Sequence, residues 1–539
     1  MRFSLRYRYR SRALAATAAL VTVASLATAS LTPQASATDR QAAAVQAGPA
    51  VEDDGADCAV PDPGASPADP KLPDPFRKLD GTRISTTSEW RCRRAEIREQ
   101  AERSVYGQKP AKPAGVTGTV SSTGITVNVT DQGKSAGFTA KVELPSGSGP
   151  FPAVVVLGGL GADTATIKAS GAAVVNFDPY TVGREGTPRN NKQGAFYSVY
   201  GSSSGTGLLM AWSWGVSRII DVIEQSGGSL LKADATGVTG CSRFGKGAFV
   251  AGAFDQRIDL TMPIESGSGG APVFRGIPGE SGGQPLSSAY SEQPWLGDAF
   301  GSFTGNPATL PVDTHEIVGM VAPRGLFLME NPHVDWLSAR SGSVAALGGA
   351  EVYKALGAGS NISYWSDVQD GTHCAARSEW KGPLQQSISK FLLNTGTAPG
   401  VFRVSPRKSG DLSAWKDWQT PVLTGVGDPD DGGGPDDGSD ATCTAGYRTV
   451  QSWSGGFQGE VSIRNNSSNT ALTGWTVGMT LAAGQSISNL WNGVNTGTSG
   501  PITVRNAPWA GATAPDGTTT FGFTATGSPT TPPGNLTCA

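Results

Sequence analysis

The stretch 237–248 constrains the fold of this chain more than any other. It reads Gly-Val-Thr-Gly-Cys-Ser-Arg-Phe-Gly-Lys-Gly-Ala, follows a short predicted strand at 230–236 and leads into an apolar run, 248–254, that predicts a helix. Glycines, a small residue and one serine between a strand and a helix indicate a sharp turn, which lifts a hydroxyl above the end of a parallel sheet. The pattern departs from G-x-S-x-G, because Gly245 comes one residue late.

Strand and helix patterns alternate on both sides of this turn. Continuous apolar runs predict buried parallel strands at 152–159, 172–177 and 325–330. The apolar spacing of 208–223 predicts an amphipathic helix, and a closing helix is predicted at 384–393. Residues 116–144 alternate in hydrophobicity, which predicts antiparallel strands ahead of the parallel ones. We therefore expect an α/β fold, with a sheet covered by helices on both faces.

The amino-acid composition changes along the chain. Its 539 residues are enough for more than one domain. A basic start, an apolar stretch at 13–27 and the sequence Ala-Ser-Ala at 35–37 predict a secretory signal peptide. We predict a signal peptide at 1–37, a disordered segment at 38–57, an α/β-hydrolase domain at 58–422, a flexible Gly/Asp/Pro linker at 423–441 and an all-β sandwich module at 442–539. We expect a secreted, extracellular monomer.

Composition excludes several functional classes. The net charge is −3 and only 16% of the residues are charged, so no basic patch suggests nucleic acid as a partner. Beyond the signal peptide, no segment approaches the roughly 20 apolar residues of a membrane span. The chain has three histidines, His315, His333 and His373, without the Cys/His spacing of a zinc site. We expect no metal and no cofactor, and we expect His315 and His333 to be structural.

Export makes disulfides plausible, and six cysteines allow fifteen pairings. The pairs that we consider are Cys58–Cys92, Cys241–Cys374 and Cys443–Cys538, and the domain layout singles out only the last, which lies within the C-terminal module. The first would tie an extended N-terminal arm to a helix predicted around 89–105, and the last would close nearly the whole C-terminal module. The middle pair would hold the neighbour of Ser242 next to the neighbour of His373.

If Ser242 is a nucleophile, it needs a base and an acid that orients the base. In α/β-hydrolases the three follow in the order Ser, acid, His, and His373 lies after the last major strand. Glu265 ends the strand that follows the nucleophile helix, whereas Glu330 and Asp335 follow the next strand, the more usual position for the acid. The residues alone leave these three carboxylates open.

Longer strings of residues are more specific than the turn by itself. They are Gly-Cys-Ser-Arg-Phe-Gly-Lys-Gly-Ala at 240–248, Glu-Ser-Gly-Ser-Gly-Gly at 265–270, Ala-Pro-Arg-Gly-Leu-Phe at 322–327, Asp-Trp-Leu at 335–337 and His-Cys at 373–374. Over residues 58–402 the chain resembles the glucuronoyl esterases, carbohydrate esterase family 15. The resemblance implies an α/β-hydrolase three-layer sandwich. It also implies the triad Ser242, Glu265 and His373, an oxyanion-stabilising Arg243 and the Cys241–Cys374 bridge.

The same resemblance assigns four residues to binding of a glucuronate ring: Lys246, Gln284, Glu292 and Trp336. Without it, the plainer interpretation of Lys246 is a solvated lysine at a helix start, and that of Trp336 is a core aromatic. Residues 369–372, before the histidine, differ from the fungal pattern, so the shape of that loop stays open.

The C-terminal module resembles the family 2 carbohydrate-binding modules. The resemblance rests on the tryptophan-containing strings at 452–458, 474–477 and 490–493, together with Trp509. It implies a surface strip of Trp453, Trp491 and Trp509 that binds a cellulose surface, with Trp475 buried. Sugar faces stack on such rings, and each ring contributes at most a few kcal/mol, at about 25 cal/mol per Å² buried.

Together these features predict a serine esterase that hydrolyses 4-O-methyl-glucuronoyl esters linking glucuronoxylan to lignin alcohols. Two rival hypotheses are an acetyl-xylan or feruloyl esterase with the same triad, and a catalytically inactive carbohydrate-binding protein. The first rival predicts no need for Lys246 or Glu292. The second is disfavoured because serine, glutamate and histidine are all present.

Overall fold

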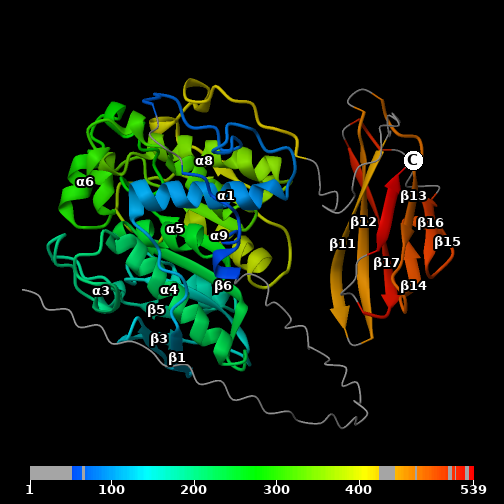
Figure 1. Ribbon diagram of the computed structural model, residues 1–539, viewed down its shortest axis with the longest axis horizontal. Coiled ribbons are helices and arrows are strands. Elements are labelled where there is room, and N and C mark those ends of the chain that lie inside the picture. Colours follow the sequence, from blue (N-terminus) through cyan, green and yellow to red (C-terminus); the bar gives the residue numbers. More distant parts are fainter. Residues whose placement is uncertain are drawn as a thin grey trace, which may run out of the picture. The chain divides into compact units, whose positions relative to one another are not determined.

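The computed structural model describes residues 51–62, 67–423, 443–453, 455–467, 470–507, 513–515, 517–528 and 533–538 (Figure 1). The predicted signal peptide, nearly all of the predicted linker and Trp509 lie outside this part of the chain. Within it, no helix combines the length and the apolar character that crossing a membrane requires.

One mixed sheet organises the described residues before the linker. Its strands are β1 (Gly115–Val120), β2 (Gly124–Asp131), β3 (Lys134–Glu143), β4 (Phe151–Leu157), β5 (Ala173–Phe177), β6 (Leu231–Cys241), β7 (Ile258–Ile264), β8 (Gly325–Met329), β9 (Ile362–Trp365) and β10 (Phe402–Arg403). They lie in the order β1-β2-β3-β5-β4-β6-β7-β8-β9-β10. Strands β1, β2, β3 and β5 pair antiparallel, and from β5 through β4 to β10 every pairing is parallel.

Helices cover both faces of the sheet, because its central strands are apolar on both sides. In β4, Val155 packs into one core cluster and its neighbour Val154 into the other, as the two-residue period of a strand requires. The helices are α1 (Glu89–Ala101), α2 (Thr164–Ala169), α3 (Ala195–Tyr200), α4 (Leu208–Gln225), α5 (Arg243–Phe254), α6 (Leu286–Glu292), α7 (Thr314–Val321), α8 (Ala339–Ala355) and α9 (Ser378–Phe391). Helices α2 and α9 pack into the second cluster, and the others pack into the first. The three-layer α/β sandwich is confirmed.

The closing helix begins earlier than its sequence predicts. It was expected at 384–393, but α9 starts at Ser378 and contains Pro383. Proline lacks the N–H that a helix interior needs, so the pattern favours a start after it. The additional turn carries Trp380, which is 3% exposed and belongs to the second core cluster. Burial of this large side chain stabilises the turn despite the proline.

The disorder expected over 38–57 does not hold for residues 51–57. Glu52 is buried and lies 3.0 Å from Lys109 Nζ, 2.5 Å from Arg218 Nη2 and 3.3 Å from Arg257 Nη2. These cations come from distant parts of the chain, so local composition gives no sign of them. A carboxylate with such partners can be buried, and it fixes the segment in place.

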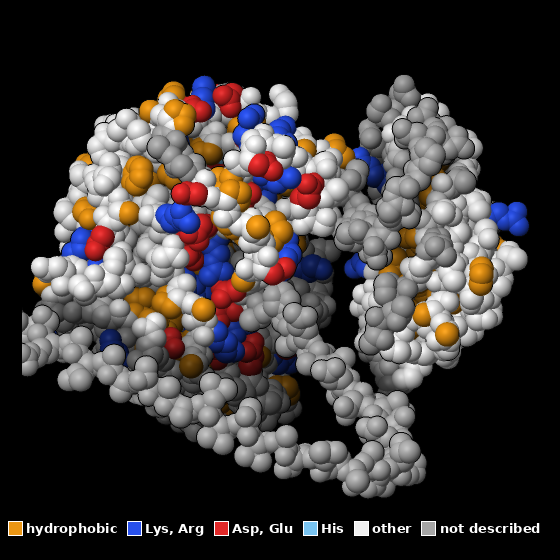
Figure 2. Space-filling view, in the orientation of Figure 1, with side chains coloured by type: hydrophobic (Ala, Val, Ile, Leu, Met, Phe, Trp, Pro, Cys, Tyr) orange, Lys and Arg blue, Asp and Glu red, His pale blue; other side chains and the backbone are white. Residues whose placement is uncertain are grey.

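The Cys58–Cys92 disulfide, considered above as a tie between the N-terminal arm and a helix, joins this N-terminal segment to α1. Arg91 and Arg94 of α1 add ion pairs to Asp54, and Arg91 also pairs with Asp57. In Figure 2, positive and negative side chains are interspersed on the visible face of the described residues before the linker. Mixed signs of this kind leave no single-sign surface on that face.

The C-terminal module consists of two antiparallel sheets. Its strands are β11 (Cys443–Trp453), β12 (Gly456–Asn465), β13 (Thr476–Thr480), β14 (Ser486–Trp491), β15 (Gly493–Thr496), β16 (Pro501–Asn506), β17 (Thr518–Thr526) and β18 (Gly534–Cys538). One sheet has the order β11-β12-β17-β14 and the other β15-β16-β13-β18. The Cys443–Cys538 disulfide closes the module, and the all-β sandwich is confirmed.

Candidate active site

The turn at the end of β6 holds its serine in an uncommon backbone conformation. β6 ends at Cys241 and α5 begins at Arg243, so Ser242 alone joins them, with φ 59° and ψ −125°. The N–H of Ser242 donates to the carbonyl of Ile264 at 2.9 Å. A Cβ at Gly245 would lie 2.5 Å from that same carbonyl oxygen, which explains the glycine that comes one residue late. This strained strand-to-helix turn presents the serine at a cavity.

A histidine that lines the same cavity contacts a buried glutamate. His373 Nδ1 lies 2.5 Å from Oε2 of Glu265, which follows β7 and is fully buried. The same oxygen accepts a hydrogen bond from the N–H of Cys374 at 2.9 Å. His373 and Ser242 both line the cavity. The arrangement offers a base for the serine hydroxyl and a carboxylate that orients the base.

The two other candidate acids make different contacts. Glu330 follows β8 and is buried, and its burial, with the charge of Glu265 as a smaller cause, raises its pKa to about 8. A neutral carboxyl cannot supply the negative charge that a protonated imidazole needs. Asp335 is exposed and pairs with Lys408 at 3.1 Å. Of these three carboxylates, the one in contact with His373 is Glu265.

The Cys241–Cys374 disulfide ties the nucleophile turn to the histidine loop. Gly161, in the loop after β4, lies against this bridge, since a Cβ there would be 2.7 Å from the Cβ of Cys241 and 3.0 Å from that of Cys374. The two cysteines, Glu265 and His373 are close enough together to resemble a metal site. The sulfur atoms of Cys241 and Cys374 are bonded to each other, however, and do not supply the thiolates that such a site uses.

The cavity beside Ser242 has a volume of about 380 Å³, within the usual range for ligand sites. It is lined by Ser242, Arg243, Lys246, Gly267, Gln284, Glu292, Trp295, Trp336, Leu337 and His373. All four residues that the family resemblance assigns to ring binding are among them. Charged and amide groups with aromatic rings suit a polyhydroxylated ring better than an apolar acyl chain.

Three of these four residues are held by polar contacts. Gln284 Nε2 donates to Glu292 Oε2 at 2.7 Å. Lys246 is buried and donates from Nζ to the carbonyl of Ser266. Burial lowers the pKa of Lys246 to about 8, although the charge of Glu292 acts in the opposite direction. Lys246 is therefore not a solvated lysine at a helix start.

Trp336 is not a core residue either, because it is 54% exposed. Its ring stands edge-on to the ring of His373, with centroids 6.0 Å apart. Its backbone carbonyl accepts a hydrogen bond from the N–H of Gln284 at 3.3 Å. An exposed indole beside the base can contact whatever occupies the cavity.

Glu185 is a residue of this site that the sequence did not reveal. Its Oε2 accepts hydrogen bonds from Arg243 Nη1 at 2.6 Å and from the Tyr180 hydroxyl at 2.8 Å, and its Oε1 accepts one from Trp295 Nε1 at 2.5 Å. Burial is the largest single influence on the pKa of Arg243 and lowers it, but the hydrogen bond and charge of Glu185, together with Tyr180, raise the pKa overall. Glu185 thus holds the guanidinium as a cation at the cavity. It lies in a loop without periodicity or motif, so no sequence signal marks it.

The other two histidines lie in structural settings. His315 is fully buried, its Nε2 lies 2.8 Å from the carbonyl of Pro73, and burial lowers its pKa to about 4. His333 Nε2 lies 2.9 Å from the carbonyl of Val368. Neither histidine lines the cavity that holds Ser242.

Two of the three tryptophans expected on the binding surface of the module are described, and both are exposed. Trp453 ends β11 and is 48% exposed, and Trp491 ends β14 and is 36% exposed. Trp475 is buried and stacks on Phe521. Trp509 lies outside the described residues.

Two glycines leave room for the rings of Trp453 and Trp491 on one face of the β11-β12-β17-β14 sheet. A Cβ at Gly456 would lie 2.8 Å from the indole nitrogen of Trp453, and a Cβ at Gly522 would lie 2.3 Å from the ring of Trp491. Along β12 and β17 these glycines alternate with the buried residues of the core, so they face outward. Both indoles therefore lie against the outer face of the same sheet.

Comparison with known proteins gives consistent matches. Residues 127–357 match the sequence family described as "Glucuronyl esterase, fungi", and residues 443–538 match "Cellulose binding domain". The 4-O-methyl-glucuronoyl methylesterase of Neurospora crassa is 38% identical over 360 residues, covering 66% of this chain and 90% of that protein. The enzyme of the same name from Hypocrea jecorina is 36% identical over 360 residues, covering 66% of this chain and 76% of that protein.

Solved structures agree with these matches. The catalytic domain of the glucuronoyl esterase from Hypocrea jecorina has 35% identity and a TM-score of 0.63, covering 68% of this chain and all of that one. A serine-to-alanine variant of the Sporotrichum thermophile enzyme, in complex with methyl 4-O-methyl-beta-D-glucopyranuronate, has 34% identity and a TM-score of 0.64 over the same shares. Fold, site and comparisons define a carboxylic ester hydrolase. The chain belongs to the glucuronoyl esterase family and carries a cellulose-binding domain at its C-terminal end.

Proposed function

We propose that this protein is a secreted serine esterase that hydrolyses 4-O-methyl-glucuronoyl esters joining glucuronoxylan to lignin alcohols. One observation carries the proposal: the buried Glu265 lies 2.5 Å from His373, and His373 lines one cavity together with Ser242 and the four ring-binding residues. The names of the relatives and the glucuronate in the Sporotrichum thermophile complex support the substrate. The predicted signal peptide supports secretion.

The acyl group is transferred first to the serine. His373, oriented by Glu265, takes the proton from the hydroxyl of Ser242, and Oγ attacks the C6 carbonyl carbon of the uronate. The carbonyl π electrons move to oxygen, and the resulting negative charge is stabilised by Arg243, which Glu185 holds as a cation. When the tetrahedral intermediate collapses, the bond to the alcohol oxygen breaks. His373 gives its proton to that oxygen, and the free alcohol leaves.

Water completes the cycle by the same steps. His373 takes a proton from a water molecule, whose oxygen attacks the glucuronoyl ester on Ser242. The second intermediate collapses with cleavage of the bond to Oγ, which recovers its proton from His373. The products are the free glucuronic acid side group and the unchanged enzyme, so neither a metal ion nor a cofactor enters the balance.

The ring-binding residues distinguish this reaction from those of the rival esterases. Lys246, Gln284 and Glu292 offer donors and acceptors to ring hydroxyls, and Trp336 offers an aromatic surface. An acetyl group has no ring, and the ring of a feruloyl group is aromatic and carries a single hydroxyl. An enzyme for those esters therefore has no need of these four side chains.

This difference can be tested with Lys246→Met on two esters. We expect kcat/KM for benzyl glucuronate to fall about 10- to 100-fold, the value of a lost charged hydrogen bond, and kcat/KM for 4-nitrophenyl acetate to change less than about 3-fold. Lys168→Met is the control, because Lys168 is a partly exposed lysine that pairs with Glu143. Equal losses on both esters would make Lys246 a merely structural residue and contradict the assignment.

A further inference from the structure

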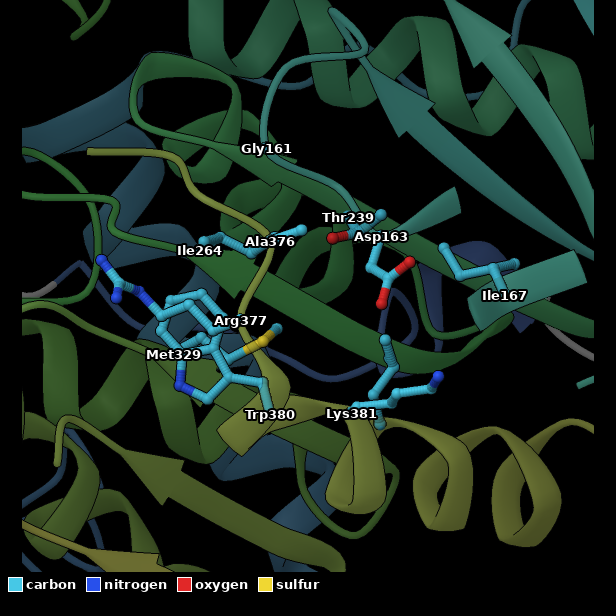
Figure 3. Close-up of a pocket in the computed structure, with 11 residues that line it drawn as sticks. Gly161, Asp163, Ile167, Thr239, Ile264, Met329, Ala376, Arg377, Trp380 and Lys381 are labelled. Atoms are coloured by element: carbon cyan, nitrogen blue, oxygen red, sulfur yellow. The ribbon is translucent and has the colours of Figure 1, made fainter. Parts of the chain in front are cut away.

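Arg377 is a buried cation for which the mechanism above has no role. Its side chain is 3% exposed and lies just before α9. In Figure 3 its guanidinium points away from Asp163 and Lys381, at the far side of a small cavity where Met329 and Trp380 lie next to it. The guanidinium also lies over the ring of Trp380, 5.4 Å from the centroid. Packing of this kind fixes the direction in which the cation points.

The guanidinium points toward the loop that precedes the base. Arg377 Nη2 donates to the carbonyl of Thr372 at 2.7 Å and to that of Asp370 at 3.2 Å. Its Nη1 lies 3.4 Å from Asp370 Oδ2. Thr372 is the residue directly before His373, so one side chain holds the peptide through which the base is attached.

The same guanidinium lies next to the acid. Arg377 Nε is 3.8 Å from Glu265 Oε1, the carboxylate oxygen that His373 does not contact. Asn331, which is fully buried, makes longer contacts with the same two groups: its Nδ2 is 3.4 Å from Glu265 Oε1 and 3.5 Å from the Thr372 carbonyl. Both side chains therefore connect the acid to the peptide before the base.

The other side of the base is already anchored. Cys374 follows His373, is bonded to Cys241, and donates its N–H to Glu265. We propose that Arg377 is a positioning residue for the reaction: it anchors the Thr372 side of the loop as the disulfide anchors the Cys374 side. With both ends held, the imidazole keeps its 2.5 Å contact with Glu265. The inference rests on the roles proposed above for His373 and Glu265.

This role predicts a particular kinetic signature. Arg377 is absent from the lining of the substrate cavity, so its loss should leave binding of the ester largely unchanged. A base that is displaced by a fraction of an ångström loses catalytic efficiency, because proton transfer needs a tightly held geometry. Removal of Arg377 should therefore lower kcat and change KM little.

The experiment compares Arg377→Gln and Arg377→Lys with wild type in the full chain. Arg403→Gln is the control for loss of an arginine over a tryptophan, because Arg403 lies over Trp365 but contacts neither the acid nor the base loop; unlike Arg377, it is exposed. One readout is kcat and KM for benzyl glucuronate. The other is the strongly downfield proton NMR resonance that a short imidazole–carboxylate hydrogen bond produces, which needs no substrate.

We expect Arg377→Gln to lower kcat about 10- to 100-fold with KM within about 2-fold, and to weaken or shift the downfield resonance. Arg377→Lys, which can keep one of the contacts, should fall between this variant and wild type, and it carries the test if Arg377→Gln does not fold. Arg403→Gln should match wild type. An unchanged kcat and resonance, or a change in KM alone, would overturn the inference. If wild type cleaves no glucuronoyl ester, the proposed function fails, while the resonance still decides the role of Arg377.

Discussion

At the scale of single residues, this site depends on how its buried carboxyl groups are partnered. Glu265 contacts His373 and lies near Arg377, and Glu185 accepts hydrogen bonds from three side chains. Glu330 differs, because its Oε2 has no hydrogen-bond partner among the described residues, and burial raises its pKa to about 8. It is therefore held as a neutral acid at pH 7.

The raised pKa of Glu330 makes stability depend on pH. In the unfolded chain the group ionises near its ordinary value of 4.5, so between about pH 4.5 and 8 the folded state binds more protons. The free energy of unfolding that depends on Glu330 is highest below about pH 4.5. It falls as pH rises through this window, by at most about 5 kcal/mol in all, and the loss is complete above about pH 8. Glu330→Gln removes this loss, so the melting temperature of the esterase domain should exceed that of wild type more at pH 9 than at pH 6.

The control for Glu330→Gln is the same substitution at a carboxylate that is not buried. Glu143, at the end of β3, is about half exposed, and Glu143→Gln should show no such widening difference between pH 6 and pH 9. Thermal unfolding followed by circular dichroism measures both variants. A Glu330→Gln protein whose advantage over wild type is the same at the two pH values would show that Glu330 is not held neutral.

At the scale of elements, the loop after β4 supports the link between nucleophile and base. Gly161 has φ +74° and lies directly against the Cys241–Cys374 disulfide. Gly159, two residues earlier, has a similar φ of +71°, but a Cβ there would meet nothing within 4 Å. The two glycines thus share the same backbone strain and differ in what lies next to them.

This pair separates backbone strain from contact with the disulfide. Both Gly159→Ala and Gly161→Ala should lose about 1 kcal/mol or more of stability, because alanine disfavours a positive φ. Only Gly161→Ala should also lower kcat, because its Cβ would displace the bridge that holds the histidine loop. Steady-state kinetics and thermal unfolding of both variants test this. Equal kcat values would show that the loop does not support the site.

The strands and helices are the part of the fold that the sequence could predict. The apolar run at 152–159 appears as β4, and that at 172–177 as β5, because buried parallel strands carry continuous apolar side chains. Glu185, Asn331 and Arg377 could not be found in this way. Each is a polar residue in a loop, and a partner that places it in the site lies far away in the sequence: Trp295 for Glu185, and Glu265 for both Asn331 and Arg377. Neither periodicity nor a short motif marks such residues.

At the scale of the whole molecule, the chain combines an esterase domain with a module whose described residues include two exposed indoles, Trp453 and Trp491. Because Gly522 lets the ring of Trp491 lie on the sheet, a side chain at this position would displace the ring without removing it. The two residues therefore offer independent ways to disturb one surface.

We expect Trp491→Ala to weaken retention on crystalline cellulose about 10-fold or more, since each stacked ring contributes a few kcal/mol at most. Gly522→Val should have a similar effect, and hydrolysis of a soluble ester should stay within about 2-fold of wild type in both variants. Pull-down on cellulose measures retention, with cleavage of benzyl glucuronate as the control for the esterase. Unchanged retention in both variants would remove Trp491 from the binding surface.

The central claim of this account is that Ser242 transfers glucuronoyl groups. The most direct test is hydrolysis of benzyl glucuronate and of 4-nitrophenyl acetate by wild type and by Ser242→Ala. The account predicts strong cleavage of the glucuronate that disappears in Ser242→Ala, with a loss of about 10⁴-fold or more, and little cleavage of the acetate. The opposite preference would place the protein among the acetyl esterases, and glucuronate cleavage that survives in Ser242→Ala would contradict the proposed nucleophile.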